Sequence, residues 1–313
     1  MTRLGIGLPT MIPDADPDLI AEWAMRAESG PFGSLATGEL ITSQAYDPFV
    51  ALSVAAAVTR KINLFTNVLV LPLHNAGLVA KQAASLDRIS GGRLWLGLGV
   101  GAKKPSLSHR AGEAPPDADL PDFTAAPASP VGRYARFADQ IEFMQRIWRG
   151  EPVTESGLRV GPSPATQGGP LLLIGGYTRR LLAESVTWAG GLTTFGLAPD
   201  LDRMARDFRI FREAWQGANR KGEPRLIATH FYALGPNAES GTRNYIARHY
   251  THLDAAQQAL FAEAITPKDE TTLGRVFQGL ADAGASDVVP IPMLAALDQV
   301  DRLADVLGPL ATV

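Results

Sequence analysis

Short apolar segments alternate with longer amphipathic segments along the whole chain. The short ones, such as 62–71, are rich in β-branched and leucine side chains and end at Pro or Gly, which predicts buried strands. The longer ones, such as 201–215, repeat apolar side chains at helical spacing. Strands are expected at 4–8, 34–37, 62–71, between Gly92 and Gly101, and at 171–174, 192–195, 225–234 and 288–291; helices at 19–28, 49–59, 80–90, 132–148, 179–188, 201–215, 243–252 and 297–307.

This alternation gives about eight strand–helix pairs. Regular alternation favours a parallel sheet with helical crossovers, and about eight repeats favour a closed barrel. We therefore predict an α/β fold, a (β/α)8 TIM barrel formed as a single domain by residues 1–313. The alternative is an open, doubly wound sheet.

Two segments depart from the regular pattern. Residues 102–131 contain six prolines and little periodicity, which predicts an extended insertion after the fourth strand. Since barrel active sites lie at the carboxyl ends of the strands, we interpret 102–131 as a lid, the alternative being a surface excursion. Residues 253–269 are helical in pattern and predict an extra helix in the seventh connection.

Composition narrows the classes of partner. The 46% hydrophobic content is ample for a large core, and the net charge of −3 gives no reason to expect nucleic acid. The absence of cysteine excludes disulfides and thiolate metal sites and suits a reducing cytoplasm. Residues 1–20 do not have a signal-peptide pattern, and no apolar run reaches the roughly 18–20 residues of a membrane span. We expect a cytoplasmic enzyme with a small-molecule substrate.

The most informative stretch is 80–101. A helical pattern stops at Gly91-Gly92, and an apolar strand then enters a turn with Gly97, Gly99 and Gly101. Glycine in such a turn allows close approach of a ligand to the backbone. The stretch resembles the signature of the bacterial luciferase-like, flavin-dependent oxidoreductases; the alternative is a generic α/β unit.

The resemblance extends over nearly the whole chain in family order. It includes the second helix, the third strand, the helix after the insertion, the fifth strand with its turn, and the closing unit. These correspond to 47–59, 67–72, 132–153, 173–176 and 284–303. The resemblance implies a (β/α)8 barrel that uses a reduced flavin or a reduced deazaflavin.

The family's third strand bulges at a non-prolyl cis peptide that supports the flavin ring. By position this peptide would join Asn67 to Val68, and the alternative is an ordinary trans strand. If the barrel forms, Asn67 and Val68 should meet Gly99 and Gly175 at its carboxyl-terminal mouth.

The resemblance also implies a phosphate site after the fifth strand. A Gly-Gly turn before a helix offers backbone N–H groups, a hydroxyl and a guanidinium to a phosphate. The alternative is a plain turn with Thr178 as helix N-cap. The family places basic residues near the cofactor at the start of the helix after the insertion, although these could form a solvated face. The implied residues are Gly175, Gly176, Tyr177, Thr178, Arg179, Arg133 and Arg136.

The proton-transfer group departs from the family pattern. Members often have a His just after the second strand, where this chain has Thr37-Gly38-Glu39. Glu39 is the nearest ionisable group, and His74 follows the third strand on the same side of the expected barrel. Both are candidate catalytic residues, the alternatives being a surface carboxylate and a loop histidine. His230 could project into the mouth, or be a core residue.

Several functions remain open at this point. The leading hypothesis is a monooxygenase that uses reduced FMN and O2. A separate flavin reductase would supply the reduced FMN, because no Gly-x-Gly-x-x-Gly fingerprint of a dinucleotide-binding unit is visible. The rival is a reductase or dehydrogenase that transfers hydride with coenzyme F-420. A non-redox barrel enzyme acting on a phosphorylated substrate and a non-catalytic cofactor-binding homologue are further alternatives. The apolar helix at 49–58 predicts a homodimer, since family members pair through early helices.

Overall fold

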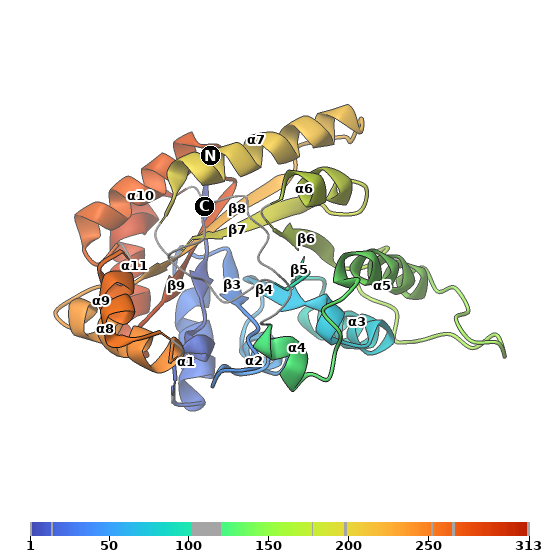
Figure 1. Ribbon diagram of the computed structural model, residues 1–313, viewed down its shortest axis with the longest axis horizontal. Helices are drawn as coiled ribbons and strands as arrows, with labels where there is room; N and C mark the ends of the chain where they lie inside the picture. Colours follow the sequence, from blue (N-terminus) through green and yellow to red (C-terminus); the bar gives the residue numbers. More distant parts are fainter. Residues whose placement is uncertain are drawn as a thin grey trace.

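Eight strand–helix units close into a barrel in the computed structural model (Figure 1). All the strand pairs are parallel. The first strand is divided at Gly5: β1 (Arg3–Leu4) pairs with β9 (Asp287–Pro292), and β2 (Ile6–Gly7) pairs with β3 (Ser34–Thr37). One strand bonded to both neighbours joins the two ends of the sheet, which confirms the predicted TIM-barrel fold. The structure describes residues 2–13, 15–101, 120–176, 178–196, 199–251, 253–264 and 267–311.

The remaining elements follow in the expected order. The other strands are β4 (Asn63–Val70), β5 (Leu94–Gly99), β6 (Leu171–Gly175), β7 (Gly191–Gly196) and β8 (Arg225–Tyr232). The outer helices are α1 (Asp18–Glu28), α2 (Pro48–Val58), α3 (Ala76–Ser90), α5 (Arg133–Trp148), α6 (Arg179–Ser185), α7 (Leu201–Gly217), α10 (Glu270–Asp282) and α11 (Asp298–Leu307). The additional helical elements are η1 (Pro9–Met11), η2 (Leu71–Leu73), α4 (Pro121–Ala125), α8 (Ala238–His249), α9 (Ala255–Ala264) and η3 (Gly308–Leu310).

Alternation along each strand builds two apolar layers. Side chains of one parity, such as Phe65 and Ile227, fill the barrel, whereas their neighbours Leu64 and Ala228 pack against the helices. Near the amino-terminal end of the barrel, the Trp95 and Phe65 rings pack edge to face with their centroids 6.1 Å apart. The Arg225 guanidinium lies 4.0 Å from the Trp95 ring centroid. Trp95 therefore belongs to the core at the end opposite the mouth.

The stretch that carries the family resemblance is largely structural. Gly91 ends α3 in the left-handed conformation with φ of 72°. Asp87 is fully buried, and its carboxylate accepts hydrogen bonds from the Thr166 N–H at 2.8 Å and the Thr166 hydroxyl at 3.2 Å. Arg93 donates to the Ile62 carbonyl at 2.7 Å and so holds the chain before β4. These contacts fix α3 and β5, which in turn fix the position of Gly99.

The connection after the seventh strand differs from the prediction. The expected helix at 253–269 is only α9, α8 starts before residue 243, and α10 was not predicted. Gly274 and Gly279 weaken the local helix propensity of α10, but burial of Leu273, Phe277 and Leu280 on one face stabilises it. Residues 102–119 of the predicted lid lie outside the described residues; the part from 120 to 131 contains α4.

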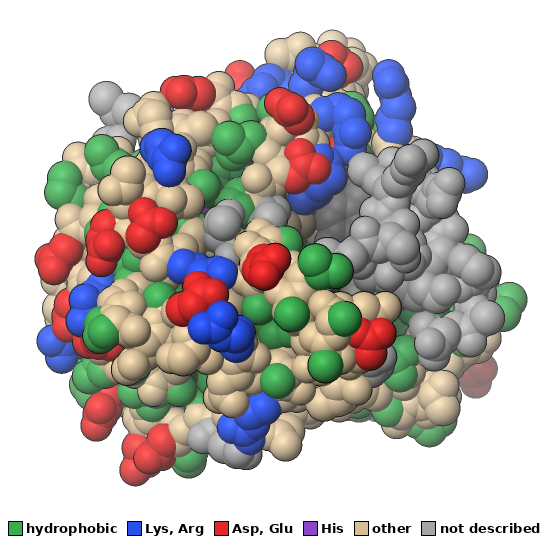
Figure 2. Space-filling model, turned by 60° about the vertical axis from the view of Figure 1, so that its left-hand side comes forward, with side chains coloured by type: hydrophobic (Ala, Val, Ile, Leu, Met, Phe, Trp, Pro, Cys, Tyr) green, Lys and Arg blue, Asp and Glu red, His purple; other side chains and the backbone are tan. Residues whose placement is uncertain are grey.

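The surface shown in Figure 2 mixes acidic and basic side chains among neutral and apolar ones. Within the described ranges, no helix is both long and apolar enough to cross a lipid bilayer.

Candidate active site at the mouth of the barrel

The end of β4 carries the feature that the family resemblance implied. The register between β4 and β5 shifts between Thr66 and Leu69, and the Asn67–Val68 peptide is cis. Gly99 and Gly175 pair in register at the ends of the two following strands. A Cβ on Gly99 would lie 2.8 Å from Val68 Cγ2, and a Cβ on Gly175 would lie 2.7 Å from Val68 Cγ1. The two glycines therefore make room for the bulge, and the four residues meet at the mouth as predicted.

The Asn67 side chain is held from across the barrel. Its Oδ1 accepts a hydrogen bond from the Thr193 hydroxyl at 2.8 Å, and its Nδ2 donates to Thr229 Oγ1 at 3.2 Å. Since Thr193 is on β7 and Thr229 on β8, neither of which neighbours β4 in the sheet, these bonds cross the interior. Neither threonine was predicted from the sequence, because a threonine on a strand carries no chemical signal of its own.

Glu39 and His74, proposed separately from the sequence, form a pair. His74 Nε2 lies 2.7 Å from Glu39 Oε1, and Glu39 Oε2 accepts the Val70 N–H at 2.7 Å. The Glu39 side chain is 5% exposed and the His74 side chain 27% exposed. Burial alone lowers the pKa of His74, but the hydrogen bond and the charge of Glu39, aided by Asp47, raise it above its ordinary value.

The pair is attached to the bulge by the backbone. Val70, which donates to Glu39, lies two residues after Val68, and a Cβ on Gly38 would lie 3.0 Å from the Asn67 carbonyl oxygen. Beside Glu39 is a cavity of about 140 Å³ between β3 and α2, lined by Leu40, Ile41, Ala45, Tyr46, Asp47 and Pro48. This arrangement places a buried carboxylate, a protonatable imidazole and a small cavity beside one another, which suits general acid–base chemistry.

The turn after β6 has the contact expected of a helix start. Thr178 is the N-cap of α6, and its hydroxyl accepts the Leu181 N–H at 3.3 Å. A Cβ on Gly176 would lie 2.6 Å from Leu181 Cδ2, so this glycine also allows α6 to pack closely. Arg179 is exposed at the first position of the helix. Tyr177 lies outside the described residues, and phosphate binding at this turn stays a prediction.

The two arginines at the start of α5 differ in environment. Arg133 is buried, donates to the Pro130 carbonyl at 3.2 Å and lies 5.1 Å from the Tyr134 ring centroid, so it does not form a solvated face. Arg136 is half-buried and donates to the backbone carbonyls of Ser129 and Val131. Both hold the turn that precedes α5; contact with a cofactor stays a prediction for each.

His230 does not face the mouth. Thr229 bonds to Asn67 inside the barrel, and the next residue on a strand points to the opposite face. The His230 ring is fully buried, and its Nδ1 lies 2.9 Å from the Phe231 carbonyl oxygen. Burial lowers the pKa of His230 to about 4, so the ring is neutral at physiological pH. Of the two alternatives drawn from the sequence, the structure bears out the core residue.

With this geometry established, comparison with known proteins gives the class. The sequence profile described as "Luciferase-like monooxygenase" matches residues 2–297. The chain therefore belongs to the luciferase-like monooxygenase family, whose members are oxidoreductases.

Curated relatives share only part of their length with this chain. It is 28% identical over 189 residues to an uncharacterized protein of Mycobacterium tuberculosis, covering 58% of this chain and 60% of that protein. It is 32% identical to the 4-hydroxyprotoasukamycin monooxygenase of Streptomyces nodosus subsp. asukaensis, covering 42% of this chain and 29% of the enzyme. It is 35% identical to the F420-dependent glucose-6-phosphate dehydrogenase of Beutenbergia cavernae, covering 37% of this chain and 30% of that enzyme.

Solved structures match over the full length and show the fold. The monooxygenase RslO1 from Streptomyces bottropensis superimposes with a TM-score of 0.78 at 19% identity, covering 99% of this chain and 100% of that one. The coenzyme F420-dependent tetrahydromethanopterin reductase from Methanopyrus kandleri superimposes with a TM-score of 0.73 at 17% identity, covering 99% of each chain. The oxygenating constituent of 3,6-diketocamphane monooxygenase from Pseudomonas putida, in complex with FMN, superimposes with a TM-score of 0.67 at 16% identity. The match covers 99% of this chain and 97% of that one.

Proposed function

We propose that this chain is a monooxygenase that binds reduced FMN at the mouth of the barrel and uses O2 to oxygenate a small organic substrate. The observation that carries the proposal is the cradle at the β4 bulge, in which the Val68 side chain rests on Gly99 and Gly175. Because these two strand ends carry no side chains of their own, the bulge can settle against them and present the Asn67–Val68 peptide to a planar ring. Relatives named as monooxygenases support the oxygenation.

The residues at the mouth fit such a cofactor. The bulge at Asn67–Val68 offers a surface for the ring, and the start of α6 offers the backbone N–H groups of its first turn and the Arg179 guanidinium to its phosphate. Bound reduced flavin supplies the electrons with which O2 reacts. A separate flavin reductase would supply it, since the chain has no Gly-x-Gly-x-x-Gly fingerprint.

In this proposal His74 holds the proton that the reaction needs. The buried Glu39 carboxylate accepts the Nε2 hydrogen, which orients the ring and stabilises its protonated form. His74 is the more exposed member of the pair, so its Nδ1 is the atom that exchanges a proton with substrate. Glu39 acts through His74.

The second candidate is hydride transfer with coenzyme F-420. The specific observation in its favour is that the comparisons include F420-dependent enzymes both among sequence relatives and among structures with the same fold. The same cradle and the same phosphate turn would serve both cofactors, because both carry a planar ring system and a phosphate group.

Anaerobic titration with reduced FMN and with reduced F-420 tests the proposal. We expect reduced FMN to bind, whereas binding of reduced F-420 alone would favour the second candidate. Arg179→Gln should weaken the binding about tenfold, or about 1.4 kcal/mol, through loss of a charge-assisted contact to phosphate. Arg180→Gln is the matched control, since the neighbouring Arg180 pairs with Glu184 at 2.7 Å. No binding of either cofactor to the wild-type chain would refute the proposal. Equal affinity of Arg179→Gln and Arg180→Gln for the cofactor would refute phosphate binding at the start of α6.

We also propose that the chain forms a homodimer through α2 and α3. Val50 on α2 and Leu78 on α3 are each 62% exposed, which leaves apolar surface on two helices that pack together. Val50→Glu is expected to convert a dimer into a monomer, because a charge buried in an apolar interface is costly. Light scattering would measure this, and a monomeric wild-type chain at high concentration would contradict it.

A further inference from the structure

A buried polar path leads from the bulge to the end of β7. Asn67 Nδ2 donates to Thr229 Oγ1 at 3.2 Å, and the Thr229 hydroxyl donates to the Thr194 carbonyl at 3.0 Å. Thr229 and Thr194 are 0% and 1% exposed. Thr193, which also bonds Asn67, is the residue before Thr194. The position of the Asn67 side chain therefore depends on where the last residues of β7 lie.

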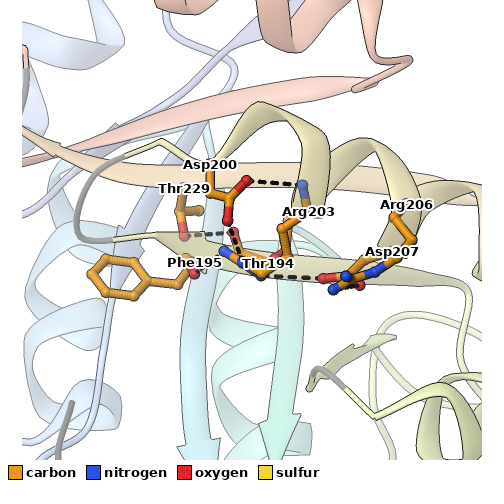
Figure 3. Close-up of polar contacts among 7 residues, drawn as sticks. All are labelled: Thr194, Phe195, Asp200, Arg203, Arg206, Asp207 and Thr229. Atoms are coloured by element: carbon orange, nitrogen blue, oxygen red, sulfur yellow. Dashed lines mark hydrogen bonds and ion pairs between the residues drawn. The ribbon is translucent and has the colours of Figure 1, made fainter. Parts of the chain in front are cut away.

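The end of β7 is in turn fixed by an ion pair on α7. Arg203 reaches back from the first turn of α7 across the strand end (Figure 3). Its Nη1 donates to Thr194 Oγ1 at 3.0 Å, and its Nη2 donates to the Phe195 carbonyl at 2.7 Å. The same guanidinium donates to the Asp207 carboxylate at 3.1 Å, and Arg206 contacts the other oxygen at 3.4 Å.

The Asp207 carboxylate sits in an unfavourable place for a charge. It is fully buried, and this burial raises its pKa, against which Arg203 and Arg206 act only in part. A buried ion pair is weak evidence for stability, since desolvation offsets much of the attraction. Its geometry is well suited to orientation, because Arg203 makes hydrogen bonds of fixed direction to a helix carboxylate and to two strand residues.

We propose that Thr229 and the Arg203–Asp207 pair are positioning residues for the cofactor site, acting on the Asn67 side chain from across the barrel. None of them needs to touch the cofactor. Thr229 holds Asn67 directly, and Arg203, oriented by Asp207, holds the strand end that bears the acceptor of Thr229. The inference rests on the proposed function, since it requires reduced FMN or reduced F-420 to bind at the mouth.

The test compares two threonines that are equally buried. Thr229→Val removes a hydroxyl with two partners, whereas Thr242→Val removes a buried hydroxyl on α8 that has no hydrogen-bond partner among the described residues. Thr229→Val is expected to raise the Kd for the cofactor that the wild-type chain binds about tenfold, and Thr229→Ser to keep it within about twofold. Thr242→Val should leave it unchanged.

A double-mutant cycle tests the part of Asp207. Asp207→Asn keeps the shape of the side chain but removes the charge that orients Arg203, so it should also raise the Kd for the cofactor. In the double variant with Thr229→Val, the rise in Kd should be smaller than the two single effects combined, because both residues act on Asn67. Additive effects, or a lower Tm with an unchanged Kd, would overturn the inference. If the wild-type chain binds neither reduced FMN nor reduced F-420, the proposed function fails first. If it binds one and Thr229→Val binds equally well, only the inference fails.

Discussion

Glu39→Gln is expected to lower kcat/KM about 100-fold, or about 2.7 kcal/mol, within the range of lost general acid–base catalysis. The amide keeps the shape of the side chain but cannot hold the protonated imidazole as a carboxylate does. With Glu39 neutralised, burial dominates and the pKa of His74 falls. Steady-state kinetics with a substrate that the wild-type enzyme accepts would measure the rate.

The pH dependence of the rate and of the His74 titration gives a second test of this pair. Because Glu39 raises the pKa of His74, protonated His74 persists to higher pH in the wild type, and the alkaline limb of the rate profile should move to lower pH in Glu39→Gln. For the same reason, the stability contributed by the pair is fully present below the ordinary His pKa of about 6.5 and is lost as pH rises through the raised value. An NMR titration of the His74 ring would show the raised pKa in the wild type and its fall in Glu39→Gln.

Glu28→Gln is the matched control. The Glu28 carboxylate accepts the N–H groups of Arg60, Lys61 and Ile62 just before β4, at the end of the barrel opposite the mouth. Glu28→Gln should reduce stability and leave kcat/KM and the His74 titration unchanged. If Glu39→Gln behaves in the same way, the pair has no part in proton transfer.

Gly99→Ala is expected to weaken binding of the reduced cofactor by 100-fold or more, about 2.7 kcal/mol. The added methyl group would lie 2.8 Å from Val68 Cγ2, closer than van der Waals contact allows, so the bulge or the strand end must shift. Overpacking of this kind costs about 1–3 kcal/mol of stability as well. Binding titration and thermal unfolding of the same preparation would measure the two effects.

Gly190→Ala separates the loss of the site from simple crowding. A Cβ on Gly190 would crowd the Leu171 side chain at the starts of β6 and β7, far from the mouth. This control should lose stability and keep its affinity for the cofactor. Parallel losses of affinity in the two variants would mean that the glycine cradle is not the binding surface.

The fold could be predicted from the sequence because its elements are specified locally. The β-branched run at 62–71 and the helix stop at Gly91-Gly92 each determine their own element, and about eight such units favour closure. α10 was missed because its glycines obscure a face that only tertiary packing stabilises. The cis peptide at Asn67–Val68 was found through the family resemblance, since no local pattern distinguishes it from a trans strand.

The site could be predicted less completely than the fold. Glu39 and His74 were each chosen for their place after a strand, but their pairing depends on how two loops approach in space. Thr193 and Thr229 carry no chemical signal as single threonines, and they matter only because β7 and β8 face β4 across the barrel. His230 shows the reverse case, since its residue type drew attention and strand parity turned it away from the mouth.

A crystal structure of the chain soaked anaerobically with reduced FMN, and in parallel with reduced F-420, would show where the cofactor binds. We expect the ring of reduced FMN, or of F-420 if the second candidate holds, to lie against the Asn67–Val68 peptide at the ends of β5 and β6, with its phosphate at the start of α6. A ring bound elsewhere on the barrel, with the Gly99–Gly175 cradle empty, would contradict it.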